Sequence, residues 1–198
     1  MEEKLIKSAL EIALEKSKNI KISEKELERE NFREIGKKIA GQYLTQKNYD
    51  LVSILKSYKG DSKKYILESI ESVFLSNIVL PKNNEAKKDI RKVLEGIVSI
   101  KEDKQIVSYI CGEIEQFLES YIKTVEEYYK QLKKEFQRQF ETARKEMENQ
   151  FGIKVKIDVE NNPEFQKKFR EIVSQIDSEY RNVLDEYKQR LNLIPNLS

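Results

Sequence analysis

Few side chains in this sequence of 198 residues could carry out chemistry. Histidine is absent, which excludes Ser-His and Cys-His nucleophile–base pairs and every imidazole-containing metal site. The single cysteine, Cys111, cannot form an internal disulfide or a four-cysteine zinc or iron–sulfur site within one chain. Isoleucine and valine surround it at helical spacing, so we expect a buried thiol rather than a nucleophile.

One glycine-containing segment, residues 36–41 (GKKIAG), superficially has the spacing of a phosphate-binding loop. Gln42 and Tyr43 stand where such a loop requires Lys and then Ser or Thr, and no strand precedes the segment. We interpret Gly36 and Gly41 as positions where a helix packs closely against a neighbour.

Carboxylates are abundant, for instance at Glu113, Glu115 and Glu119. In a chain with 36% charged residues, most of them are expected to be solvated or to form ion pairs along a helix. A buried all-carboxylate metal or acid–base site in the N-terminal half stays open as an alternative. We therefore predict a protein that is not an enzyme, with no cofactor, no metal and no evident small-molecule ligand.

Two basic clusters are the candidates for nucleic-acid binding. The first contains Lys87, Lys88, Arg91 and Lys92, and in the second, residues 130–145, lysine and arginine are interleaved with glutamate. The formal net charge is only +2, because 37 basic residues nearly cancel 35 acidic ones. With no global attraction to phosphate, we interpret both clusters as solvated helix faces and nucleic-acid binding as unlikely.

The composition favours a cytoplasmic helical protein. Six glycines, three prolines and a high charge content are typical of long helices with solvated outer faces. No apolar run approaches the roughly 18 residues of a membrane span, and residues 1–4 (MEEK) do not begin a signal peptide. A lone cysteine fits a reducing compartment. The many lysines and glutamates fit a thermophilic source, although an AT-rich genome would also favour lysine.

Residues 1–110 predict a bundle of about five short helices. An apolar stripe runs through residues 5–14, and Ser23 with Glu26 forms a capping box that opens a second helix. A third helix is expected over 46–58, closed by Gly60, and Asp61 is expected to cap a fourth. Asn83 or Asn84 caps a fifth. The residues expected to face inward on the second, fifth and following helices are Phe32, Ile35, Ile39, Tyr43, Ile90, Val93, Leu94, Ile97, Ile106, Val107, Ile110 and Ile114.

Residues 111–198 predict a long antiparallel helical hairpin that resembles a coiled coil. No proline or glycine interrupts residues 113–151, which suggests one helix that is continuous from near residue 104. Two apolar stripes, over 122–151 and 165–194, are mirror images about residue 158 and predict nine facing pairs, Phe136 with Tyr180 among them. Their 4-4-3 spacing predicts nearly straight arms. The hairpin either protrudes or is covered by residues 1–110.

The connection between the arms, residues 152–162, has the period of a half-buried strand. Ile153, Val155, Ile157 and Val159 alternate with polar residues, and Asn162 then caps the second arm. A lone strand leaves backbone groups unpaired, so it needs a mate from a second copy, a partner protein or elsewhere in the chain. The alternative is an irregular loop whose apolar residues fold back onto the hairpin. We predict an interaction tip formed by these four residues.

Three short segments carry a resemblance to a known family. They are residues 7–13 (KSALEIA), residues 77–81 (NIVLP) and the alternating segment that precedes residues 162–165 (NPEF). Together they resemble an uncharacterised family of bacterial helical proteins. That family has no assigned activity, so the resemblance implies no catalytic residue.

These features predict a non-enzymatic protein–protein interaction or scaffolding protein, self-associating as a homodimer or binding another protein through the tip. A structural stalk or spacer subunit of a larger assembly is the main alternative, and a nucleic-acid-binding protein is a weaker one.

Overall fold

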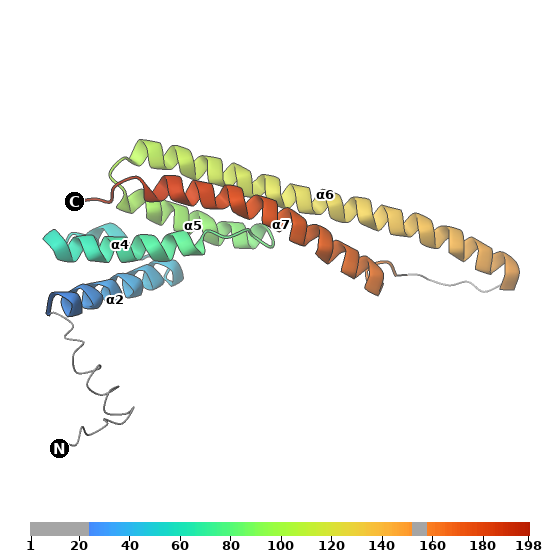
Figure 1. Ribbon diagram of the computed structural model, residues 1–198, viewed down its shortest axis with the longest axis horizontal. Coiled ribbons are helices and arrows are strands. Elements are labelled where there is room, and N and C mark those ends of the chain that lie inside the picture. The colour runs from blue at the N-terminus through green and yellow to red at the C-terminus, as the bar shows by residue number, and fades with distance from the viewer. Residues whose placement is uncertain (1–23, 152–157) are drawn as a thin grey trace, which may run out of the picture.

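The computed structural model describes residues 24–151 and 158–198, which form six helices and no strand (Figure 1). The predicted all-α class is therefore confirmed, while the apolar stripe of residues 5–14 lies outside the described residues. No helix of the described residues has both the length and the apolar character needed to cross a membrane. The helices are α2 (Glu24–Thr45), α3 (Leu51–Leu55), α4 (Gly60–Asn77), α5 (Asn84–Ile100), α6 (Lys104–Phe151) and α7 (Pro163–Asn192).

Short polar side chains begin several helices where the sequence predicts. Asn83 Oδ1 accepts a hydrogen bond from the Ala86 amide at 2.9 Å, at the start of α5. Asn162 Oδ1 accepts from the first amides of α7, with Pro163 as the first helical residue. Asp103 caps α6 in the same way, and α6 then continues for 48 residues. Each cap satisfies amide groups that a helix start leaves without partners.

Two predictions for the segment 46–61 are wrong. The helix expected over 46–58 is only α3, because Asp50 Oδ1 accepts from the Ser53 amide at 3.0 Å and sets a later start. Asp61 does not cap α4 but lies in its first turn. Gly60 begins α4 with φ of 56°, a left-handed conformation that residues with a Cβ rarely adopt.

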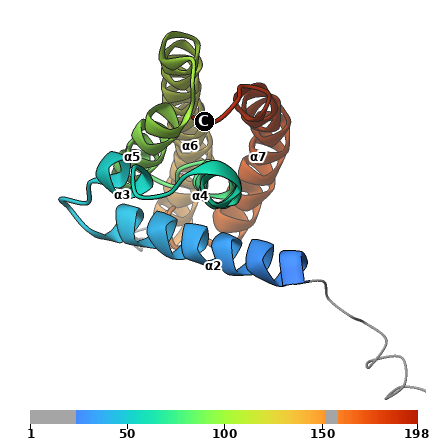
Figure 2. The same ribbon diagram turned by 90° about the vertical axis from the view of Figure 1, so that its left-hand side faces the viewer.

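The helices surround α4, as the end-on view in Figure 2 shows. Helix α2 lies on one side of α4, and α5, α6 and α7 lie on the other. Helices α2 and α4 are parallel, since Ser69 Oγ donates to the Arg33 carbonyl at 2.7 Å and the Arg29 guanidinium covers the Tyr65 ring. The chain then reverses at each of the next connections, so α4, α5, α6 and α7 are successively antiparallel.

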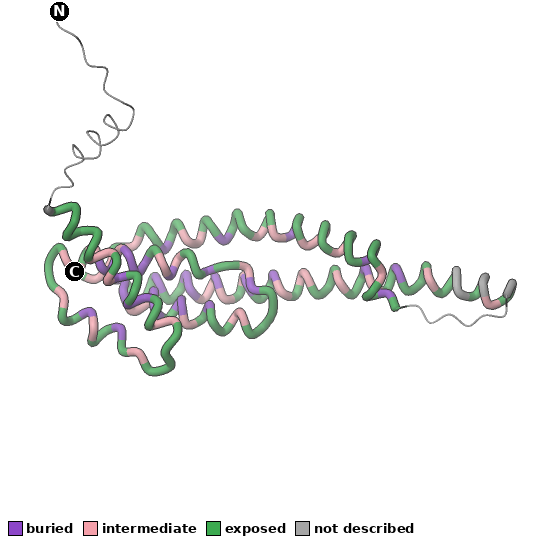
Figure 3. Tube along the Cα trace, turned by 90° about the horizontal axis from the view of Figure 1, so that it is seen from below, coloured by how far each residue is buried: buried purple, intermediate pink, exposed green. Residues whose placement is uncertain are grey.

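One apolar core joins all six helices. Among the residues expected to face inward, Ile90, Val93, Leu94 and Ile97 are buried as predicted, whereas Ile106 is 52% exposed. Figure 3 shows buried residues gathered in the bundle and sparse toward the far end of α6. The fully buried side chains include Ile66, Leu67, Ile70, Phe74, Ile97, Ile100, Ile114, Leu118, Leu184 and Leu191.

Helices α6 and α7 pack side by side, but not in the predicted register. Phe136 packs against Phe165, with ring centroids 5.5 Å apart, rather than against Tyr180. Tyr180 instead meets Tyr121 at 5.3 Å. These pairs are symmetric about a position near residue 150 rather than 158. The predicted pairing is wrong because α7 begins beside Phe136, well before the end of α6 (Figure 1).

The domain boundary predicted between residues 110 and 111 falls within helix α6, which is continuous there. Ile110 and Cys111 belong to the same core as Leu94 on α5 and Leu191 on α7. The bundle therefore covers one end of the α6–α7 pair, and the other end extends beyond it (Figure 1).

Candidate interaction surface

The far end of α6 projects beyond the start of α7. Glu160, which precedes α7, pairs with Lys133, and Phe165 in the first turn of α7 packs on Phe136. Helix α6 nevertheless continues to Phe151. We call residues 141–151 of α6 the overhang. Among the described elements, none lies beside the overhang in either view (Figures 1 and 3).

A small aromatic cluster closes the α6–α7 pair just before the overhang. Leu132, Phe136, Val159 and Phe165 are buried together. Tyr129 packs edge-on against both Phe165 and Phe169, with centroids 5.7 and 5.2 Å away, a geometry that aromatic rings prefer. Phe140 covers the outer edge of this cluster and is only partly buried, at 6.1 Å from Phe136. The overhang therefore follows directly after a partly buried phenylalanine.

Polar contacts hold the turn that leads into α7. Asp158 accepts from the Glu160 amide at 3.1 Å and from the Asn161 side chain at 2.8 Å. Lys133 donates to Glu160, and this hydrogen bond lowers the pKa of the Glu160 carboxyl and raises the pKa of Lys133. Both groups are largely solvated, so the pair orients the turn without contributing much stability.

The four residues of the predicted tip have different positions relative to the described chain. Val159 is 6% exposed and packs in the aromatic cluster, so it does not offer an exposed docking side chain. Ile153, Val155 and Ile157 lie outside the described residues, and the prediction for them stays untested.

The middle of the α6–α7 contact is polar. Tyr121 donates to Asp177 at 2.7 Å, and the Tyr180 hydroxyl lies 3.0 Å from Thr124 Oγ1 and 3.3 Å from Ser120 Oγ. Burial raises the pKa of Tyr121, and the hydrogen bond to Asp177 raises it further. This polar stretch separates the aromatic cluster from the main core, so the far end of the pair is held by its own contacts.

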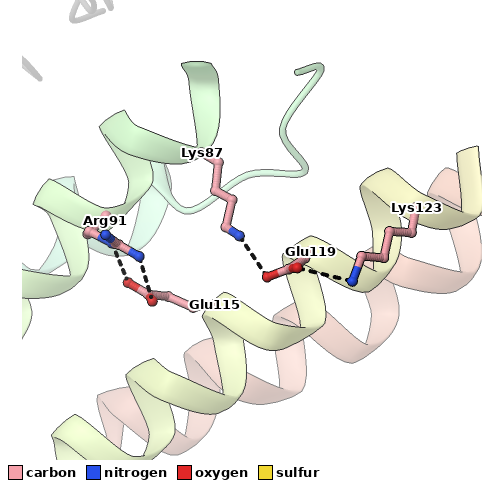
Figure 4. A network of polar contacts seen from close by, with 5 residues as sticks. All are labelled: Lys87, Arg91, Glu115, Glu119 and Lys123. Carbon is pink, nitrogen blue, oxygen red and sulfur yellow. Dashed lines mark hydrogen bonds and ion pairs between the residues drawn. The ribbon is translucent and has the colours of Figure 1, made fainter. Parts of the chain in front are cut away.

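The first basic cluster is occupied by contacts within the chain (Figure 4). Arg91 forms a two-point ion pair with Glu115, at 3.0 and 3.2 Å, across α5 and α6. Lys87 and Lys123 both bond Glu119, and these bonds lower the pKa of the Glu119 carboxyl. Lys87 and Arg91 of the cluster are thus matched by carboxylates on α6.

Lys92, the last residue of that cluster, is also engaged. Its Nζ donates to the Gln46 carbonyl at 2.7 Å and to the Leu44 carbonyl at 3.2 Å, at the end of α2. In the second cluster, Lys133 pairs with Glu160.

Cys111 is buried as the sequence predicts, at 7% exposure, with Sγ 3.9 Å from the Leu94 carbonyl. Burial raises the pKa of its thiol to about 12, and the nearby Glu115 adds to the shift. At about pH 8 the thiolate fraction should therefore be roughly a thousandfold below that of an unfolded cysteine.

We expect folded protein to react with iodoacetamide at least about a hundredfold more slowly than protein unfolded in urea. Mass spectrometry of the time course measures both rates. Comparable rates in the folded and unfolded states would contradict the burial and the raised pKa of this thiol.

Sequence reasoning missed one buried charged pair, between Lys101 and Glu71. Lys101 is 0% exposed and Glu71 is 6% exposed, and the two form an ion pair. In the sequence, residues 101–103 are only a polar break between helices. A lysine at the end of an apolar helix, next to buried Ile100, is the one local feature that could have drawn attention to it. Within the described residues, no group of three or more Cys, Asp or Glu side chains could hold a metal ion.

Comparison with known proteins gives one match. The model of a family described as "Family of unknown function (DUF6657)" matches residues 52–192, more than half of the chain. No curated protein and no solved structure matches.

Proposed function

Since the chain belongs to this family of unknown function, we propose a role from its geometry: a non-enzymatic protein–protein interaction or scaffolding protein that self-associates through the overhang. The observation that supports this most directly is the length of α6 relative to α7. A helix of 48 residues extends about 72 Å at 1.5 Å per residue, whereas α7 has only 30 residues and begins beside Phe136.

The sequence of the overhang continues an apolar stripe. In the sequence, positions 143, 147 and 151 (Ala, Met and Phe) follow Phe136 and Phe140 at helical spacing, a pattern that predicts one apolar face. An apolar helix face at the end of an elongated protein is typical of association between helices. A second copy of the chain presents the same apolar face. Pairing the two faces in a twofold interface would cover both of them.

Two finer parts of this proposal rest on the sequence alone. They are the coiled-coil-like character of the α6–α7 hairpin and the β-like segment over residues 152–162. In the proposed dimer Ile153, Val155 and Ile157 would add apolar area next to the overhang.

Light scattering coupled to size exclusion tests the proposal directly. We expect a mass twice that of the 23.5 kDa chain, and a return to monomer when Met147 and Phe151 are both replaced by Glu, since two charges would then have to be buried in the interface. A wild-type protein that stays monomeric over a wide concentration range would contradict self-association.

A matched control carries the same added charge on exposed positions of the same helix. Thr142 and Asn149 are both exposed on α6, so the double variant Thr142→Glu/Asn149→Glu should remain dimeric. If both double variants became monomeric, charge repulsion rather than the apolar face would explain the result. Unchanged helicity in circular dichroism would show that all variants fold.

A stalk or spacer subunit is the second candidate, and the continuous length of α6 favours it. In that role the bundle and the far end of α6 would bind different parts of an assembly. A monomeric wild type with unchanged mass in both double variants would favour the spacer over the self-associating protein.

A further inference from the structure

The short segment after α7, residues 193–198, crosses the corner between α5 and α6. We call it the strap. The Glu102 amide donates to the Pro195 carbonyl at 3.0 Å, and the Leu197 amide donates to the Ile100 carbonyl at 2.8 Å. Lys101 and Asn196 form an isolated antiparallel β-bridge between these two bonds. The strap is thus attached to the end of α5 by its backbone.

The strap also completes the buried ion pair. Lys101 Nζ pairs with Glu71 on α4 and donates to the Ile194 carbonyl at 2.5 Å. Asn196 Nδ2 donates to the second carboxylate oxygen of Glu71, also at 2.5 Å. One buried lysine and one buried carboxylate therefore connect α4, the α5–α6 corner and the strap. A buried charge needs all of these partners, because it has lost its water.

Apolar contacts also attach the strap and the end of α7. Leu184 and Leu191 are buried in the main core, and Tyr187, Ile194 and Leu197 are partly buried against it. Between the strap and the first turns of α4 lies a hollow of about 490 Å³, bordered by Lys63, Leu67 and Leu197. The polar contacts around Lys101 add to these apolar contacts in fixing the end of α7.

Asn196 is not fully satisfied where it lies. Its Oδ1 is buried without a hydrogen-bond partner among the described residues, although its Nδ2 bonds Glu71. The side chain is therefore held through its donor, by the bond to Glu71.

We propose that the strap is a latch: Asn196 and Ile194 hold the end of α7 to the Lys101–Glu71 pair, and release of the latch frees the C-terminal half of α7 while α4 and α5 stay folded. In the open form Leu184, Leu191 and the facing surface of α6 become accessible. Asn196 is a positioning residue in this device. The latch lies at the opposite end of α6 from the overhang and does not depend on self-association (Figure 1).

The variant Asn196→Asp tests the latch with almost no change in shape. It replaces the amide donor with a carboxylate oxygen 2.5 Å from Glu71 Oε2, so two like charges repel at the contact that closes the strap. Asn192→Asp is the matched control, since Asn192 is an exposed residue at the end of α7 and gains the same charge.

Native-state hydrogen exchange measured by mass spectrometry reports which helices open. For Asn196→Asp we expect exchange at least about tenfold faster over residues 184–197, with less than about twofold change over residues 90–97 of α5. Asn192→Asp should match the wild type in both regions. This pattern separates local release of α7 from a general loss of stability.

Two results would overturn the latch. One is equal acceleration in α5 and α7, which means that the contact only stabilises the whole fold, and the other is unchanged exchange in α7. If Asn196→Asp does not fold, Asn196→Ala removes the same donor without adding charge, and the same comparison of α7 with α5 then decides. Failure here would leave the test of self-association unaffected.

Discussion

Replacing Lys101 with alanine is expected to lower the free energy of unfolding by about 3–5 kcal/mol, because it leaves the Glu71 carboxylate buried without its cation. The Ile194 carbonyl loses its donor in the same variant. Urea denaturation followed by circular dichroism measures the change. A loss below about 1 kcal/mol would mean that water reaches the pair and that it behaves as a surface contact.

Two further variants separate the buried charge from the bulk of the side chain. In Lys101→Met/Glu71→Met no charge remains buried, so we expect most of the lost stability to return. Arg91→Ala breaks an ion pair of good geometry whose arginine is 61% exposed, and it should cost much less stability than Lys101→Ala. An equal loss in Arg91→Ala and Lys101→Ala would contradict the difference in burial between the two pairs.

The helix limits could be predicted from the sequence because short-range contacts decide them. Asn83 and Asn162 bond amides no more than three residues away, so the pattern that signals each cap is contained in four residues. The sequence pattern predicts too long a third helix, because that prediction does not include Asp50 as the cap at which α3 begins. The all-helical class and the resemblance to an uncharacterised family could also be predicted from short sequence patterns. The family match confirms the resemblance.

The register of α6 against α7 could not be predicted in the same way. The observed pairing differs from the predicted one by about 15 residues, which is close to four turns of a helix. A shift by whole turns returns an apolar stripe onto itself, so the match of nine pairs did not distinguish the two registers. The difference depends on where α7 begins along α6, and Val159 packing beside Phe136 was not visible in the alternating pattern.

The partners of Lys101 could not be predicted from the sequence, because they are distant along the chain. Glu71 is 30 residues away from Lys101 and the Ile194 carbonyl is 93 residues away. No periodic pattern joins them, and each residue type is usually solvated. At the predicted tip the situation is reversed, because a strong local pattern is present without a known contact. The alternation at Ile153, Val155 and Ile157 indicates an apolar face but does not identify what covers it.

Close packing of two helices makes Gly36→Ala the second variant with a large expected effect. A Cβ at Gly36 would lie 2.6 Å from the Ile66 carbonyl oxygen and 2.8 Å from Ser69 Cβ, on α4. Backbone cannot move aside as a flexible side chain does, so α2 and α4 would have to separate. We expect a loss of about 1–3 kcal/mol in the free energy of unfolding, measured in urea.

Gly41→Ala is the control within the same helix, and it should have the opposite sign. A Cβ at Gly41 meets nothing within 4 Å, so the variant only gains helix propensity and should stabilise the protein by about 0.5–1 kcal/mol. The two glycines were interpreted together from the sequence as close-packing positions, and the structure assigns that role to Gly36 alone. If both alanine variants were equally stable, the close approach of α2 to α4 would be wrong, and with it the position of α2 on the bundle.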